Sequence, residues 1–138
     1  MITALGFGAA YSLLGLFLLV AGFYMLDLLT PGRLGAHLTR GDSFNAGVMV
    51  AAGFLGVGAI LFTVIWHNAG AGLGPALGWT LAFGLLGIVL QAVSFVVLDL
   101  VTPGSLREIV VSPGLHPAGI AAAAAQIAIS LIICASIA

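Results

Sequence analysis

The placement of the charged residues constrains this chain more than any other feature. All seven charged side chains fall within two short segments, residues 27–45 and 99–117. Four long apolar runs without a charge lie around these segments: Ala4–Leu26, Ala46–Trp66, Leu77–Leu98 and Ala118–Ala138. A helix needs about 20 apolar residues to cross a hydrocarbon core of roughly 30 Å. The sequence therefore predicts four membrane-spanning helices.

Composition excludes a soluble globular domain. Only 5% of the residues are charged and 62% are hydrophobic, whereas a soluble domain carries about 25% charged residues. Such a chain cannot cover a water-facing surface, so its solvent must be lipid. The apolar runs do not alternate with polar residues as the strands of a membrane β-barrel do. We therefore expect an all-α membrane protein, with the lipid bilayer as its first partner.

The arginines predict the orientation of the spans. There is no lysine, and the two charged segments hold all the basic residues, Arg33, Arg40 and Arg107. Short loops rich in arginine and lysine stay in the cytoplasm. The uncharged, glycine-rich connection 67–75 and both termini should then lie outside. Trp66 and Trp79 flank that outer turn, where indole rings favour the headgroup region.

The chain contains an internal repeat. A shift of 72 residues aligns segment 26–34 with segment 98–106, and seven of the nine aligned residues are identical. Residues 1–68 and 69–138 thus form two units of two spans each within a single membrane domain. Because each unit has an even number of spans, both enter the membrane from the same side, as a parallel repeat.

The repeated loop carries a local pattern. Thr30-Pro31-Gly32 and Thr102-Pro103-Gly104 place a threonine before a proline, a pairing typical of a helix N-cap and first turn. Each should begin a short amphipathic helix that lies in the cytoplasmic membrane interface. We also expect Asn45 to cap the second span and Pro117 to lie in the first turn of the fourth.

This pattern resembles a known family. The Leu-Asp-Leu-x-Thr-Pro-Gly-x-Leu segments at 26–34 and 98–106, each leaving a span, with Asn45-Ala46 entering the next span, resemble the YjfL-like bacterial inner-membrane proteins, or domain of unknown function 350. Two such units are usual for that family. The resemblance implies a multi-pass protein of the bacterial plasma (inner) membrane, without an established activity and without a catalytic residue to transfer. The second copy departs from the pattern, with His116-Pro117 in place of Phe44-Asn45.

Asp27 and Asp99 occupy equivalent positions, each at the cytoplasmic end of a span. A helix dipole is negative there, so a carboxylate is unfavourable without compensation. One interpretation is a paired cation or proton site. The other is a carboxylate that fixes the turn by hydrogen bonding, which the location at the membrane edge favours. The candidate functional or turn-fixing residues are Asp27, Thr30, Pro31, Gly32, Asp99, Thr102, Pro103 and Gly104.

Gln91 and Gln126 are the amide side chains deep within the spans. Each lies eight residues from the cytoplasmic end of its span, or about 12 Å at 1.5 Å per residue. Equal depth predicts that they meet between the third and fourth spans, as an interhelical hydrogen-bonding pair. The alternative is a polar patch that lines a path. The first unit has Leu19 and Phe54 at these positions, so such a path would not be two-fold symmetric.

The sequence predicts no catalytic residue, no cofactor and no metal site. The three histidines, His37, His67 and His116, share no helix face, and Cys134 is the sole cysteine. Neither pattern is typical of a zinc or haem site. Three arginines also do not form a nucleic-acid-binding surface.

Two functions therefore remain in view, and neither is enzymatic. The first is a membrane subunit that forms a homo-oligomer or joins a membrane complex and presents its cytoplasmic loops to a protein partner. The second is a small channel or transporter subunit that moves a cation or small metabolite by means of Asp27 and Asp99. A membrane enzyme ranks last because no nucleophile–base pair is apparent.

Overall fold

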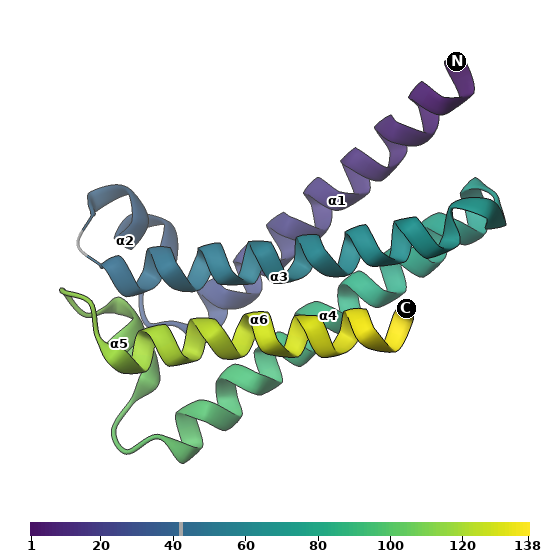
Figure 1. The fold of residues 1–138 in the computed structure, drawn as a ribbon. Coiled ribbons are helices and arrows are strands. Elements are labelled where there is room, and N and C mark those ends of the chain that lie inside the picture. Colours follow the sequence, from purple (N-terminus) through teal and green to yellow (C-terminus); the bar gives the residue numbers. More distant parts are fainter. Residues whose placement is uncertain (42) are drawn as a thin grey trace.

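The computed structural model describes residues 1–41 and 43–138, and Asp42, one of the predicted cytoplasmic charges, lies outside the described residues. Within them, the order long helix, short helix, long helix occurs twice (Figure 1). The elements are α1 (Ile2–Leu29), α2 (Leu34–Arg40), α3 (Phe44–Asn68), the 3-10 turn η1 (Ala69–Ala71), α4 (Leu73–Val101), α5 (Leu106–Val111) and α6 (Pro117–Ile137).

The four predicted spans are confirmed. The long helices contain 28, 25, 29 and 21 residues, and all four are long and apolar enough to cross a membrane. The connection predicted over residues 67–75 is shorter than expected. Gly72, at φ +86°, separates η1 from α4, and Pro75 lies within the first turn of α4, where its missing N–H costs no helical hydrogen bond.

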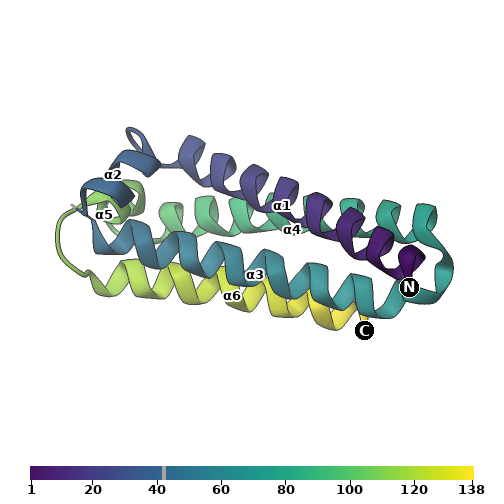
Figure 2. The same cartoon turned by 90° about the horizontal axis from the view of Figure 1, so that it is seen from above.

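The long helices form two layers, as Figure 2 shows. One layer contains α1 and α4, and the other contains α3 and α6, which run side by side in the same direction (Figures 1 and 2). Both termini and η1 lie at one end of the bundle, called here the terminal end. The short helices α2 and α5 lie at the opposite end, called the short-helix end.

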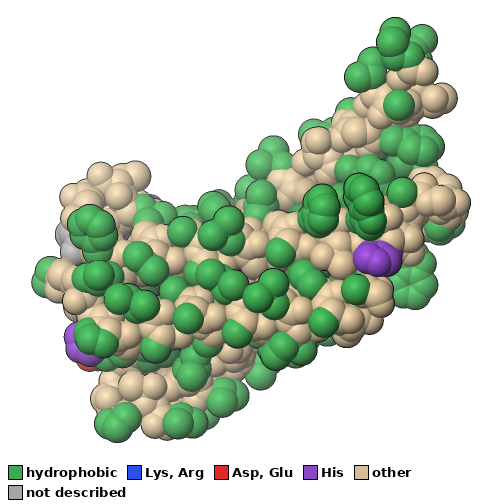
Figure 3. Space-filling model, viewed as in Figure 1, with side chains coloured by type: hydrophobic (Ala, Val, Ile, Leu, Met, Phe, Trp, Pro, Cys, Tyr) green, Lys and Arg blue, Asp and Glu red, His purple; other side chains and the backbone are tan. Residues whose placement is uncertain are grey.

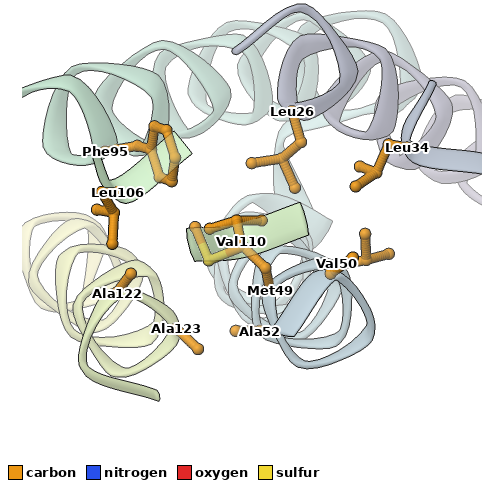
Figure 4. Packing of buried hydrophobic residues seen from close by; sticks show 11 residues of the cluster. Leu26, Leu34, Met49, Val50, Ala52, Phe95, Leu106, Val110, Ala122 and Ala123 are labelled. Atoms are coloured by element: carbon orange, nitrogen blue, oxygen red, sulfur yellow. The ribbon is translucent and has the colours of Figure 1, made fainter. Parts of the chain in front are cut away.

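A hydrophobic cluster anchors the short helices to the bundle (Figure 4). Leu34 of α2 and Leu106 of α5 are both 1% exposed, and the 72-residue shift aligns them with each other. Each inserts among apolar side chains of the long helices, so the short helices are packed elements of the fold. The other buried members of the cluster are Leu26, Ala46, Met49, Val50, Ala52, Phe95, Val110, Ala122 and Ala123.

Glycines on α4 allow the layers to approach closely. A Cβ at Gly84 would lie 2.6 Å from Leu18 Cδ1, and a Cβ at Gly87 would lie 2.5 Å from Ile60 Cδ1. Only a residue without a side chain fits at such separations, and this is how small residues commonly act between membrane helices. Hydrophobic side chains cover the outside of the bundle from one end to the other (Figure 3), as a lipid-facing surface requires.

Candidate functional site

The Thr-Pro-Gly segments end the long helices, and the prediction that they begin the short ones is wrong. Thr30 is the C-cap of α1, where its backbone N–H donates to the Leu26 carbonyl at 3.1 Å. Its hydroxyl donates to the same carbonyl at 3.0 Å. Thr102 caps α4 in the same way through its backbone, with a 2.9 Å bond to the Leu98 carbonyl.

The following glycine explains this difference from the prediction. Gly32 has φ +77° and Gly104 has φ +95°. These left-handed conformations are compatible with glycine and break the right-handed helix. The short helices therefore begin only beyond the glycines, with Arg33 as the N-cap of α2 and Ser105 as the N-cap of α5.

The two aspartates reach across these turns to the start of the short helices. Asp27 Oδ1 accepts a 2.6 Å hydrogen bond from the Leu34 backbone N–H. Asp99 Oδ1 accepts from the Leu106 N–H at 2.8 Å and the Arg107 N–H at 3.3 Å. The first backbone N–H groups of a helix lack partners within it, and its amino end favours negative charge. Each carboxylate is thus poorly placed for its own helix and well placed for the next one.

The two carboxylates differ in their second oxygen. Asp99 Oδ2 lies 3.3 Å from Arg107 Nε, an ion pair in which the aspartate side chain is 18% and the arginine side chain 43% exposed. Arg107 Nε is buried and lacks hydrogen-bond alignment, so the contact is a charge pair by distance alone. No cation of the described residues lies within ion-pair distance of Asp27. The second carboxylate is therefore neutralised locally and the first is not.

Gln91 of α4 and Gln126 of α6 lie side by side in the bundle interior. The Gln126 side-chain amide donates to the Gln91 backbone carbonyl at 3.0 Å. The Gln91 side-chain amide donates to Ser130 Oγ at 2.8 Å, and that hydroxyl donates to the Gln126 carbonyl at 2.8 Å. All three side chains are at most 1% exposed. The amides and the serine thus join α4 to α6 without a charge.

Helix α3 completes this polar cluster with its backbone. The Gly53 carbonyl lies 3.5 Å from Gln91 Nε2, at the limit of hydrogen-bond distance. A Cβ at Gly56 would lie 2.5 Å from the same Nε2 and would also overlap Ser130 Oγ. The serine and the glutamine therefore fit between the helices because position 56 has no side chain.

Asn45 plays a role that the sequence analysis missed. The prediction that it caps the second span is wrong, because Ser43 is the N-cap of α3 and accepts from the Ala46 N–H at 3.2 Å. Asn45 is fully buried and binds the second half of the chain instead. Its Nδ2 donates to the carbonyls of Ile109 at 3.1 Å and Gly114 at 2.7 Å. Its Oδ1 accepts from the backbone N–H of His116 at 3.0 Å.

Two neighbours reinforce this connection. Ser43 Oγ donates to the Val110 carbonyl at 2.7 Å, so α3 also binds the end of α5. A Cβ at Gly119 would lie 2.5 Å from Asn45 Oδ1, so α6 can approach Asn45 only with a glycine there. The predicted place of Pro117, in the first turn of α6, is confirmed, with His116 as N-cap. The only sequence signal for Asn45 was its mismatch with Pro117 in the repeat.

No group of three or more histidine, cysteine or acidic side chains in the described part of the chain is arranged to hold a metal ion. The polar side chains described above bind backbone groups of the turns and neighbouring helices. Fold and site together define an all-helical, multi-pass membrane protein whose interior polar groups hold its own elements in place.

The particular family follows from comparison with known proteins. Residues 1–137 match the family described as Domain of Unknown Function (DUF350), and the chain belongs to it. The resemblance noted in the sequence is thereby confirmed. The chain is 33% identical over 127 residues to a UPF0719 transmembrane protein of Mycolicibacterium paratuberculosis, covering 92% of this chain and 83% of the relative. A UPF0719 transmembrane protein of Mycobacterium bovis is 34% identical with the same coverage. No solved structure matches.

Proposed function

We propose that this protein is a non-enzymatic subunit of the bacterial plasma membrane that oligomerises or joins a membrane complex. The observation that carries the proposal is that polar side chains of the bundle bind the protein's own backbone. Asn45 joins the two halves of the chain at the short-helix end, and Gln91 and Gln126 join α4 to α6. Side chains used in this way build a scaffold.

The exposure of the long helices supports assembly with further chains. In its most apolar window, α1 buries only 17% of its residues inside the bundle, whereas α3 buries 50%. Helix α1 thus offers most of its surface to lipid or to another membrane helix. Association of such helices rests on packing and hydrogen bonding, since lipid is as apolar as leucine.

We further infer the orientation and the repeat organisation. Arg33, Arg40 and Arg107 all belong to the segments at the short-helix end, which supports a cytoplasmic location for α2 and α5 and an outside location for both termini. These short helices would then be presented to a cytoplasmic protein partner. The aligned aspartate turns support residues 1–68 and 69–138 as parallel repeat units of one membrane domain.

Cross-linking in native membranes followed by mass measurement in lipid nanodiscs tests the subunit proposal. We expect a defined species larger than the 13.9 kDa chain, either a homo-oligomer or a complex with a membrane partner. A single monomeric species under both conditions would refute the proposal. Because no partner need be known in advance, the whole chain can be measured as it is expressed.

One observation favours the alternative of a channel or transporter subunit. Asp27 retains an oxygen without a partner among the described residues, as a cation-binding carboxylate would. Liposomes containing the purified protein would distinguish the two. Cation flux that disappears in Asp27→Asn would support transport, whereas tight liposomes and an oligomeric species would support the subunit.

A further inference from the structure

A cavity of about 560 Å³ lies beside Asp27 at the short-helix end. Its volume is within the range of pockets that hold small ligands, roughly 300–1,000 Å³. It is formed between the last turns of α1 and the start of α2. The lining residues are Phe23, Tyr24, Asp27, Arg33, Gly35 and Ala36.

The cavity presents two opposite charges that do not neutralise each other. Asp27 uses Oδ1 to hold the Leu34 N–H, and its Oδ2 has no partner among the described residues. Arg33 is exposed, and its guanidinium forms no ion pair within the described part of the chain. A carboxylate and a guanidinium that line one cavity without pairing can bind the two ends of a zwitterion.

The aromatic wall suits a cation. Phe23 and Tyr24 are arranged edge to face, with ring centroids 6.1 Å apart. Aromatic faces attract an ammonium group by cation–π interaction. The positive end of a ligand therefore belongs near Asp27 and these rings, and the negative end near Arg33.

The second half of the chain closes the equivalent place. The 72-residue shift aligns Gly35 with Arg107, whose side chain pairs with Asp99. It also aligns Arg33 with Ser105, which bears no charge. The first half therefore has a glycine where the second half supplies its own cation, and a ligand cation can take that place beside Asp27.

We propose that this cavity binds the headgroup of a zwitterionic phospholipid that carries a primary ammonium, as phosphatidylethanolamine does. The ammonium donates a hydrogen bond to Asp27 Oδ2, and the phosphate binds Arg33, a residue suited to phosphate oxygens. A choline headgroup has no N–H to donate and would bind less well. Since α1 ends at Leu29, Asp27 lies within the last turn of the span, at the depth where headgroups are found.

Lipid retention measured by native mass spectrometry tests the proposal. The protein is released from nanodiscs that contain equal amounts of phosphatidylethanolamine, phosphatidylcholine and phosphatidylglycerol. We expect preferential retention of phosphatidylethanolamine by the wild type. Asp27→Asn, Arg33→Gln and Gly35→Arg should each reduce that retention roughly tenfold, as expected for loss of a charge-assisted hydrogen bond.

The third variant transfers the arrangement of the second half to the first. A Cβ at Gly35 would be 3.9 Å from its nearest neighbour, Phe23 Cζ, so the longer side chain can be accommodated. Arg40→Gln and Glu108→Gln are matched controls, because each removes one charge from an exposed residue outside the cavity. Both controls should retain the lipid as the wild type does.

Three outcomes would overturn the proposal. The first is equal retention of all three lipids by the wild type. The second is a loss in the controls as large as that in the cavity variants. The third is displacement of the bound lipid by soluble phosphoethanolamine at comparable concentration, which would assign the cavity to a free ligand and not to a lipid headgroup. A melting curve for each variant separates loss of the site from loss of the fold.

Discussion

The side-chain amide of Asn45 lies 2.7 Å from the Gly114 carbonyl and so binds the start of α3 to the connection between α5 and α6, 69 residues further along the chain. With its bonds to Ile109 and His116, this one side chain satisfies three backbone groups of the second half. Such an arrangement is the counterpart of a helix cap, made between distant segments.

Replacement of Asn45 should therefore destabilise the protein substantially. Asn45→Ala leaves two carbonyls and one N–H without their partner, at a total cost of about 2–4 kcal/mol in the free energy of unfolding. Unfolding in detergent micelles, followed by circular dichroism, measures this. Asn68→Ala is the matched control, since Asn68 makes a single local bond to the Val64 carbonyl. Equal losses in both variants would contradict the role assigned to Asn45.

A pair of glycine variants on α3 tests the packing of the polar cluster. Gly56→Ala forces a methyl group against Gln91 and Ser130 and should cost about 1–3 kcal/mol by overpacking. Gly58→Ala, one half-turn away, meets nothing within 4 Å and should gain up to about 1 kcal/mol from helix propensity. The two melting temperatures should thus shift in opposite directions, and a shared direction would show that the cluster is looser than described.

Neutralising the aspartates should have unequal effects. Asparagine keeps one acceptor for the short-helix N–H, so Asp27→Asn should cost less than about 1 kcal/mol of stability. Asp99→Asn also leaves Arg107 without its charge partner and should cost about 1–2 kcal/mol, a modest value because the pair is partly exposed. Thermal unfolding of each single variant measures the difference. Unchanged stability and assembly in the double variant would count against a structural role for both residues.

Cysteine labelling in intact cells should decide the orientation. In a Cys134→Ala background, Gly70→Cys should react with a membrane-impermeant maleimide, because the η1 turn is expected outside. Ala36→Cys, on α2, should react only after the cells are opened, since the arginine-bearing segments are expected to stay in the cytoplasm. Labelling of position 36 and not of position 70 would reverse the assignment.

The spans could be predicted because they depend on a property summed over about 20 residues. The absence of charge from each run is insensitive to local detail, so the four helices were found with ends displaced by only a few residues. The contact between Gln91 and Gln126 follows from the same regularity, since neighbouring helices of constant rise bring residues of equal depth together.

The turns could not be predicted from the sequence in the same way. A threonine before a proline is compatible with the start of a helix and with the end of the preceding one. The backbone of Gly32 and Gly104 decides between these possibilities. The partners of Asn45 lie 64 to 71 residues away, and no local pattern encodes contacts of that separation.

The parallel course of α3 and α6 has a consequence for how this protein holds together. The most extensive helix contact joins helices that are not consecutive in the chain, and the short η1 turn that links the halves takes no part in it. The interface is therefore independent of the covalent connection. A chain severed after Ala71 retains every contact of Asn45 and of the two glutamines. The two fragments contain what they need to recognise each other as separate polypeptides, in the manner of a heterodimer joined by gene fusion.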